Sequence, residues 1–212
     1  MMKMTVLVIA GLSLLCESQA APGSSDQEIA AAVLPLPDQL KSGAAVVRLN
    51  RSGFPEPVRK GTNTMVCIAN RPGSDRFDVR CYQEDFIGVV YRAIQLVAEG
   101  IRGEQVSKQI EGEIKAGKQS LPSHPTAGYR CLGPAKAYNA STNTATDEIY
   151  CWESVHFPFR TARELGLMEE SEIPEDMQRK LPFVMASGTY WCHVMIMHPN
   201  GEDHAHKLKP GN

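Results

Sequence analysis

The sequence predicts an α+β domain: a mostly antiparallel sheet with one well-buried helix at about 85–99 and one surface helix at about 104–116 packed on it. Strand-like segments lie before and after these two consecutive helices, unlike the regular alternation of a parallel α/β fold. The chain has 212 residues, of which 42% are hydrophobic, enough for one domain with a substantial core.

The first twenty residues have the organisation of a cleavable signal peptide. Lys3 provides a positive start, residues 6–15 are apolar, and Ser18 and Ala20 place small residues at positions −3 and −1 of a cleavage site. The apolar run is shorter than the roughly 20 residues that span a bilayer. We therefore expect a secreted or periplasmic protein with no transmembrane segment in the mature chain.

A lipid anchor at Cys16 is the competing interpretation, but Leu15 stands where lipoproteins usually have a small residue. The mature chain is expected to form one globular domain over residues 21–198. Within it, residues 21–43 are predicted to be a peripheral lead-in, and residues 199–212 a flexible polar tail.

The lead-in contains a short helix at 28–34 that two prolines end, and a strand at 45–49 follows it. The helix predicted at 85–99 has a broad apolar face, which indicates burial. The helix at 104–116 has a narrow apolar stripe at four-residue spacing, which is typical of a surface helix.

A hairpin is predicted from residues 64–69 and 76–82, because an apolar run and an alternating run flank the turn residues 71–75. If residue 71 opposes residue 77, then Cys67 opposes Cys81. A cross-strand disulfide between these two cysteines is therefore expected.

A second cysteine pair flanks a long polar loop. Residues 128–132 and 148–155 are predicted strands, and the loop between them is rich in Asn, Ser and Thr. A bridge between Cys131 and Cys151 would remove much of the entropy of the unfolded chain. The mature chain has five cysteines, so at least one is left over, and we expect Cys192 to be buried and structural.

Towards the C-terminus, residues 161–165 are a candidate helical turn and residues 169–180 are charged and expected to be exposed. Residues 181–185 and 190–197 are apolar on both faces, which predicts a central strand pair with a turn at Ser187–Gly188.

Two histidines on these predicted strands are candidate catalytic residues. His156 and His193 share faces with Trp152 and Trp191, and with Arg160 they could line one pocket if the two strands are neighbours. A buried histidine of this kind could serve as a general base. The alternative is that both are core histidines that donate to backbone carbonyls.

His198, His204 and His206 are candidate metal ligands, because imidazole and nearby carboxylates are ligands that zinc accepts. They lie in the predicted tail, and the chain has no HExxH or CxxC motif, so a solvated tail is the competing interpretation.

The net charge of −2 gives no electrostatic case for nucleic-acid binding, and no phosphate-binding glycine motif occurs. Basic residues such as Arg59, Lys60 and those at 102–118 are scattered among acidic ones and are expected to be solvated.

We therefore expect an exported, soluble, non-enzymatic domain that binds a ligand or has an envelope or extracellular role, and that needs no cofactor. The alternative is an exported hydrolase or lyase that uses His156 and His193, with or without a divalent metal such as zinc. Substrate and partners are not indicated by the sequence.

Overall fold

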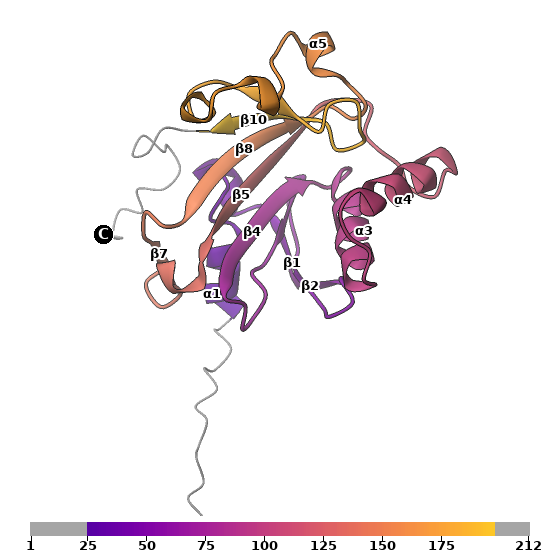
Figure 1. Cartoon of the computed structure of the whole chain (residues 1–212). Coiled ribbons are helices and arrows are strands. Elements are labelled where there is room, and N and C mark those ends of the chain that lie inside the picture. The colour runs from indigo at the N-terminus through magenta and orange to yellow at the C-terminus, as the bar shows by residue number, and fades with distance from the viewer. Residues whose placement is uncertain (1–24, 198–212) are drawn as a thin grey trace, which may run out of the picture.

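The computed structural model describes residues 25–197 (Figure 1). The predicted signal peptide at 1–20, the alternative lipidation site Cys16 and the predicted tail at 199–212 lie outside the described residues. No helix in the described part of the chain is long and apolar enough to cross a membrane.

An eight-stranded sheet organises the molecule, as the sequence predicted, and every neighbouring pair of strands is antiparallel except β1 and β3. The structure is therefore α+β. From one edge to the other, the strands are β2 (Pro55–Arg59), β1 (Ala45–Leu49), β3 (Met65–Ile68), β4 (Arg76–Gln83), β5 (Thr126–Pro134), β8 (Tyr150–His156), β10 (His193–Met197) and β9 (Phe183–Met185).

Two helices pack on one face of this sheet: α3 (Ile87–Ala98) and α4 (Glu104–Lys115). Both lie within one residue or two of the predicted ranges. α3 buries four of its apolar residues, whereas α4 buries two, in accordance with its narrow stripe. Arg92 of α3 and Glu113 of α4 form an ion pair at 2.8 Å that joins the two helices.

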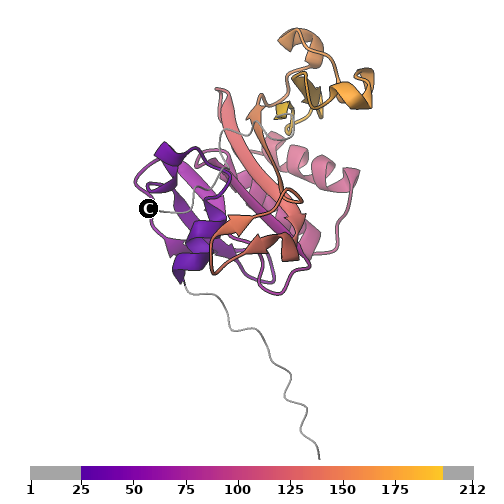
Figure 2. The same ribbon diagram turned by 90° about the vertical axis from the view of Figure 1, so that its left-hand side faces the viewer.

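The opposite face of the sheet is covered by α1 (Ser25–Ala32) and the segment after it, which continues into the short helix α2 (Asp38–Lys41) (Figures 1 and 2). Residues 31–36 are buried and pack against strands β3 and β4. The prediction of a peripheral lead-in was therefore wrong for this part, because its Leu and Val side chains cover an otherwise exposed apolar sheet face.

The two disulfides join the cysteine pairs that the sequence indicated. Cys67 lies opposite Cys81 in the register of β3 and β4, and Cys131 lies opposite Cys151 in that of β5 and β8. The Cα atoms are 4.0 and 4.1 Å apart. Cys192 is a buried free thiol, and burial raises its pKa.

The C-terminal strand pair lies at an edge of the sheet, so the prediction of a central position was wrong. β9 is the edge strand, and a single bridge from Glu169 to Val184 partly covers it. Both faces of the pair are apolar because irregular segments from 157–181 cover them. These segments contain the helical turn α5 (Ala162–Leu165) and the 3-10 turns η2 (Glu170–Glu172) and η3 (Glu175–Met177).

Two further pairings were not predicted. β2 is an edge strand that begins at Pro55, in a segment for which no strand was expected. The polar loop at 133–147 contains the 3-10 turn η1 (Ala135–Ala137) and a small hairpin of β6 (Tyr138–Asn139) and β7 (Thr144–Ala145).

Candidate functional site

The two candidate catalytic histidines lie next to each other on the face of the sheet that α3 covers. His156 is the last residue of β8 and His193 the first of β10, and the register places them directly opposite each other. Their rings stack with centroids 5.0 Å apart. The structure thus brings together the pair that the strand patterns suggested.

His156 is enclosed by aromatic rings. Its ring centroid is 4.4 Å from that of Phe86, 4.8 Å from that of Trp191 and 5.7 Å from that of Tyr82. Only 1% of the residue is exposed. Desolvation by this burial, together with the neighbouring His193, holds the pKa of His156 well below its usual value, so its ring is neutral.

Hydrogen bonds hold both rings in place. Nε2 of His156 lies 3.2 Å from Oγ of Ser154, which also donates to the Gly128 carbonyl. Nδ1 of His193 lies 2.7 Å from the Trp191 carbonyl and donates to it. Burial lowers the pKa of His193, although this hydrogen bond opposes the shift. Both rings are therefore packed among core residues, and Nδ1 of His156 is buried without a hydrogen-bond partner.

A glycine provides the space for this cluster. A Cβ atom at Gly128 would lie 2.7 Å from Oγ of Ser154 and 3.0 Å from both Nε2 of His156 and a ring carbon of Tyr82. Any larger residue at this position would push the serine and histidine apart.

Arg160 does not join the histidines. Its guanidinium is exposed and pairs with Glu164 at 3.3 Å. It lines a separate hollow of about 450 Å³ with His124, Phe157 and three prolines. The proposed grouping of Arg160 with His156 and His193 was therefore wrong, because Phe157 and the two residues after it turn the chain away from the end of β8.

The candidate metal ligands His198, His204 and His206 lie outside the described residues. Within residues 25–197, no group of three or more His, Cys, Asp or Glu side chains is arranged to hold a metal ion.

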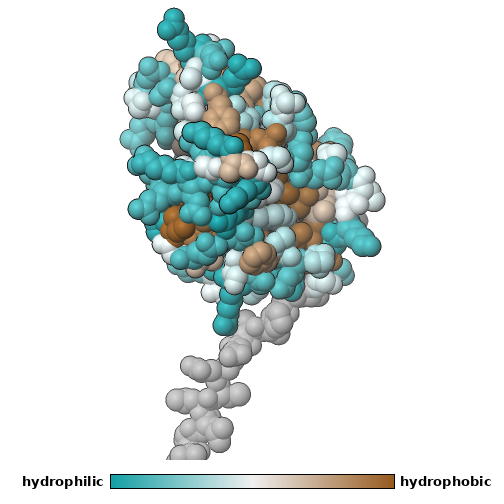
Figure 3. All heavy atoms as spheres, turned by 90° about the vertical axis from the view of Figure 1, so that its right-hand side faces the viewer, coloured by the Kyte–Doolittle hydropathy of each residue, from teal (hydrophilic) through white to brown (hydrophobic). Residues whose placement is uncertain are grey.

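An open groove of about 790 Å³ lies beside α3. One wall is formed by residues of α3, from the buried Val90 to the exposed Val97 and Ala98. The floor is formed by the ends of β1 and β3 and the first half of β4. The segment 186–191 completes the groove with Tyr190 and Trp191. In Figure 3, which faces α3 and α4, hydrophobic side chains form several separate patches among hydrophilic ones. The apolar lining residues are Leu49, Ile68, Ala69, Val90, Ala93, Ile94, Val97, Ala98, Ala186, Tyr190 and Trp191.

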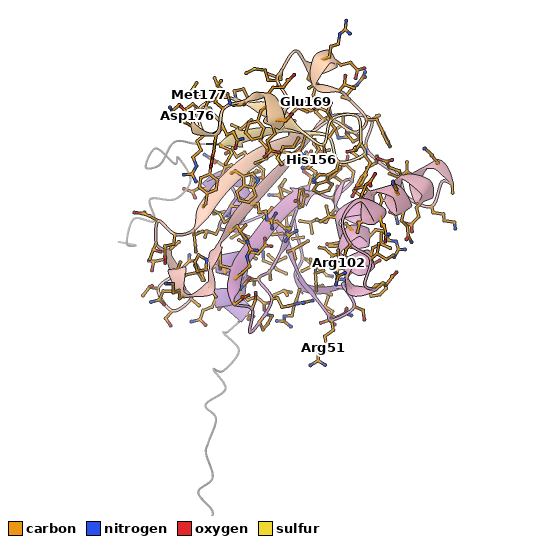
Figure 4. The ribbon with its side chains drawn as sticks, viewed as in Figure 1. Arg51, Arg102, His156, Glu169, Asp176 and Met177 are labelled. Atoms are coloured by element: carbon orange, nitrogen blue, oxygen red, sulfur yellow. A yellow bond between two sulfur atoms is a disulfide. The ribbon has the colours of Figure 1, made fainter. Side chains whose placement is uncertain are left out.

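Four arginines without acidic partners line the groove beside its apolar residues. Arg51, Arg71, Arg76 and Arg102 all line the groove and are exposed, and none has an ion pair with a carboxylate among the described residues. In Figure 4, Arg51 lies at the lower tip of the described part of the molecule, and Arg102 lies between Arg51 and His156 in the view. Arg102 donates to the carbonyl oxygens of Val97 and Ile101 at the end of α3, which fixes its position.

A single acidic residue lines the groove. Asp78 accepts hydrogen bonds from Arg130 at 2.9 and 2.8 Å and also pairs with Arg80. Burial alone would raise the pKa of Asp78, but the two guanidinium groups outweigh it and hold the pKa below its usual value. Asp78 is thus ionised and is shared between Arg80 and Arg130. These three side chains together carry a net positive charge.

Arg48 also lines the groove, but Glu28 of α1 binds its guanidinium through two hydrogen bonds and neutralises its charge. The sequence did not indicate the groove, because its arginines are far apart along the chain. The one available signal is that an arginine closely follows β1, β3 and α3, while another begins β4.

Comparisons with models of protein families, with curated proteins and with solved structures gave no match for this chain. The functional interpretation therefore rests on the geometry of the groove and of the histidine cluster.

Proposed function

We propose that this protein is an exported, non-enzymatic domain that binds a small amphipathic anion in the groove beside α3. The single observation that supports this function most strongly is the combination of an apolar lining with four arginines that lack acidic partners. The groove volume of about 790 Å³ lies in the range of small-molecule sites. The two disulfides fit an oxidising, extracytoplasmic compartment.

The charge of the groove contrasts with that of the whole chain. The net charge is −2, yet the groove has one acidic lining residue and several arginines. Guanidinium groups bind carboxylates and phosphates through paired hydrogen bonds, and an apolar body would be removed from water by the lining. An anion with an apolar body therefore complements both features at once.

Burial of the histidines favours this proposal over the hydrolase or lyase alternative. His156 and His193 are 1% and 8% exposed, and their rings pack against other rings. A general base must reach the proton that it abstracts. Nε2 of His156 contacts Ser154, Nδ1 of His156 is buried without a hydrogen-bond partner, and Nδ1 of His193 donates to a backbone carbonyl.

The test is calorimetric titration of dodecanoate, a simple amphipathic anion, into the native protein and into the double variant Arg71→Gln/Arg76→Gln. Both arginines are exposed, so their replacement is expected to leave the fold intact. A charge-assisted hydrogen bond contributes about 1.5–3 kcal/mol, so the variant should bind about tenfold more weakly or worse.

The matched control is Lys60→Gln/Arg163→Gln, which removes two exposed cations that do not line the groove. Its affinity should stay within about twofold of the native value, since distant surface charges are screened. Equal weakening in both double variants, or no binding of dodecanoate to the native protein, would contradict the proposed function.

A further inference from the structure

We propose that the groove selects a linear ligand with a single anionic head and a long apolar chain, and that it binds this ligand in one orientation. The head lies among Arg51, Arg71, Arg76 and Arg102, and the chain extends along α3 towards Trp191. This inference rests on the proposed function and adds the ligand class and its direction.

The four arginines without acidic partners gather at one end of the groove because of the sheet topology, whereas Arg80, which pairs with Asp78, lines the groove farther along β4. β1 and β3 are parallel, so Arg51 and Arg71, which follow these strands, lie at the same end of the sheet, beyond the strands' C-terminal ends. β4 is antiparallel to β3, so Arg76 at its start lies there too.

The C-terminal end of α3 lies at this same end of the sheet. Gly53 lies in the turn after β1, and a Cβ atom added to it would lie 3.0 Å from the backbone nitrogen of Gln95 in α3. The turn therefore packs closely on the last part of the helix. Arg102 is bound to carbonyl oxygens in and just after that part, so it joins the other arginines.

The opposite end of the groove is aromatic. The Trp191 ring lies 5.4 Å from that of Phe86, which directly precedes α3, and 6.0 Å from that of Tyr82, near the end of β4. Both are measured between centroids. Trp191 thus lies where α3 begins, whereas Arg76 and Arg102 lie where β4 begins and α3 has ended.

The distance between the two ends fits an extended chain. From Arg76 to Tyr82 the strand rises about 20 Å at about 3.3 Å per residue. The wall residues of α3, from Val90 to Ala98, extend over about 12 Å at 1.5 Å per residue. These residues are apolar on the side that lines the groove, so a hydrocarbon chain of intermediate length can lie along them. A compact or doubly charged anion would leave this surface uncovered.

The experiment uses two brominated probes, because bromine quenches indole emission only at close contact. The mature protein is saturated with 12-bromododecanoate, which has bromine at the end of the chain, or with 2-bromododecanoate, which has it beside the carboxylate. Calorimetry verifies saturation by each. The variants Trp191→Phe and Trp152→Phe then assign the quenched emission to one of the two tryptophans.

We expect 12-bromododecanoate to quench the emission at least threefold more than 2-bromododecanoate. This difference should vanish in Trp191→Phe and persist in Trp152→Phe, because Trp152 does not line the groove. Equal quenching, or stronger quenching by 2-bromododecanoate, when both probes are bound would overturn the orientation but leave anion binding intact. Failure of both probes to bind would overturn the proposed function as well.

Discussion

Gly128 shows how one small residue permits the polar cluster in the core. Its missing side chain leaves space for Ser154, His156 and Tyr82, which would all lie within 3.0 Å of a Cβ atom. Neighbouring side chains at full packing density have little room to move, so the serine–histidine contact depends on this position. The histidine and the aromatic rings around it also support Trp191 at the end of the groove.

We predict that Gly128→Ala destabilises the fold by about 1–3 kcal/mol, the usual cost of overpacking a core. Urea unfolding monitored by circular dichroism measures this change. Gly112→Ala is the control, because no atom lies within 4 Å of a Cβ added there on the surface helix α4, so its stability should be unchanged or raised. An unchanged free energy of unfolding in Gly128→Ala would contradict the account of the cluster.

A pH dependence follows from the two buried histidines. Both have a pKa below the unfolded value of about 6.5, so the unfolded chain binds their protons more readily than the folded one. Stability is therefore full above about pH 6.5 and falls as the pH decreases below it, with a slope that approaches about 1.4 kcal/mol per pH unit for each histidine.

The measurement is the free energy of unfolding between about pH 7.5 and 5.5. This range stays above about pH 5, where the unfolded chain begins to protonate the carboxylates whose folded pKa is lowered. In His156→Phe, the loss of stability on acidification should be shallower, because one titrating group is removed while ring packing remains. A native protein equally stable across this range would show that the two rings are not held neutral.

At the scale of elements, one disulfide joins β3 to β4 and another joins β5 to β8. The Cys131–Cys151 bridge has a sequence separation of 20 and encloses the polar loop with the β6–β7 hairpin. Ala137 of this loop is buried and Tyr138 stacks on Phe77, while residues 139–142 and 144–148 are exposed. The bridge restricts the freedom of this segment in the unfolded chain.

We predict that the double variant Cys131→Ala/Cys151→Ala loses about 3 kcal/mol of stability, as expected for a loop of this length. The free energy of unfolding of the reduced native protein provides a comparison, and it should fall by at least as much because both bridges are then open. A loss well below 1 kcal/mol would mean that the loop is ordered by other contacts.

Much of the element content could be predicted from the sequence. Alternation in residues 76–82 and the broad apolar face at 85–99 are local signals, and the cysteine positions indicated the register. β2 was not expected; it contains Pro55 and Pro57, and within sheets proline is largely confined to edge strands, where β2 lies. The predicted central position of the C-terminal strand pair, β9 and β10, was wrong because a central strand and a covered edge strand both have apolar faces.

At the scale of the whole molecule, the sheet topology assembles the groove from distant segments. Arg51, Arg71, Arg76 and Arg102 are separated by up to about fifty residues, and each resembles an ordinary solvated charge in the sequence. Only the parallel pairing of β1 and β3, and the packing of α3 over them, brings these charges to one end. The histidine pair was easier to predict, since strand alternation alone indicates which residues share a face.

The groove also explains how a chain of net charge −2 could bind an anion. The acidic residues of the chain pair elsewhere, as Glu28 does with Arg48 and Glu113 with Arg92, or lie on other surfaces. The local field of the groove, rather than the net charge, then determines which ligands are attracted.

The most direct test of this account is the ratio of two dissociation constants, measured by calorimetry on the native mature protein at low ionic strength. The ligands are dodecanoate and dodecyltrimethylammonium, which share an alkyl chain and differ in the sign of the head group. The arginines predict that the anion binds at least about tenfold more tightly, and that added salt reduces this ratio. Equal affinities, or tighter binding of the cation, would contradict an anion-binding groove.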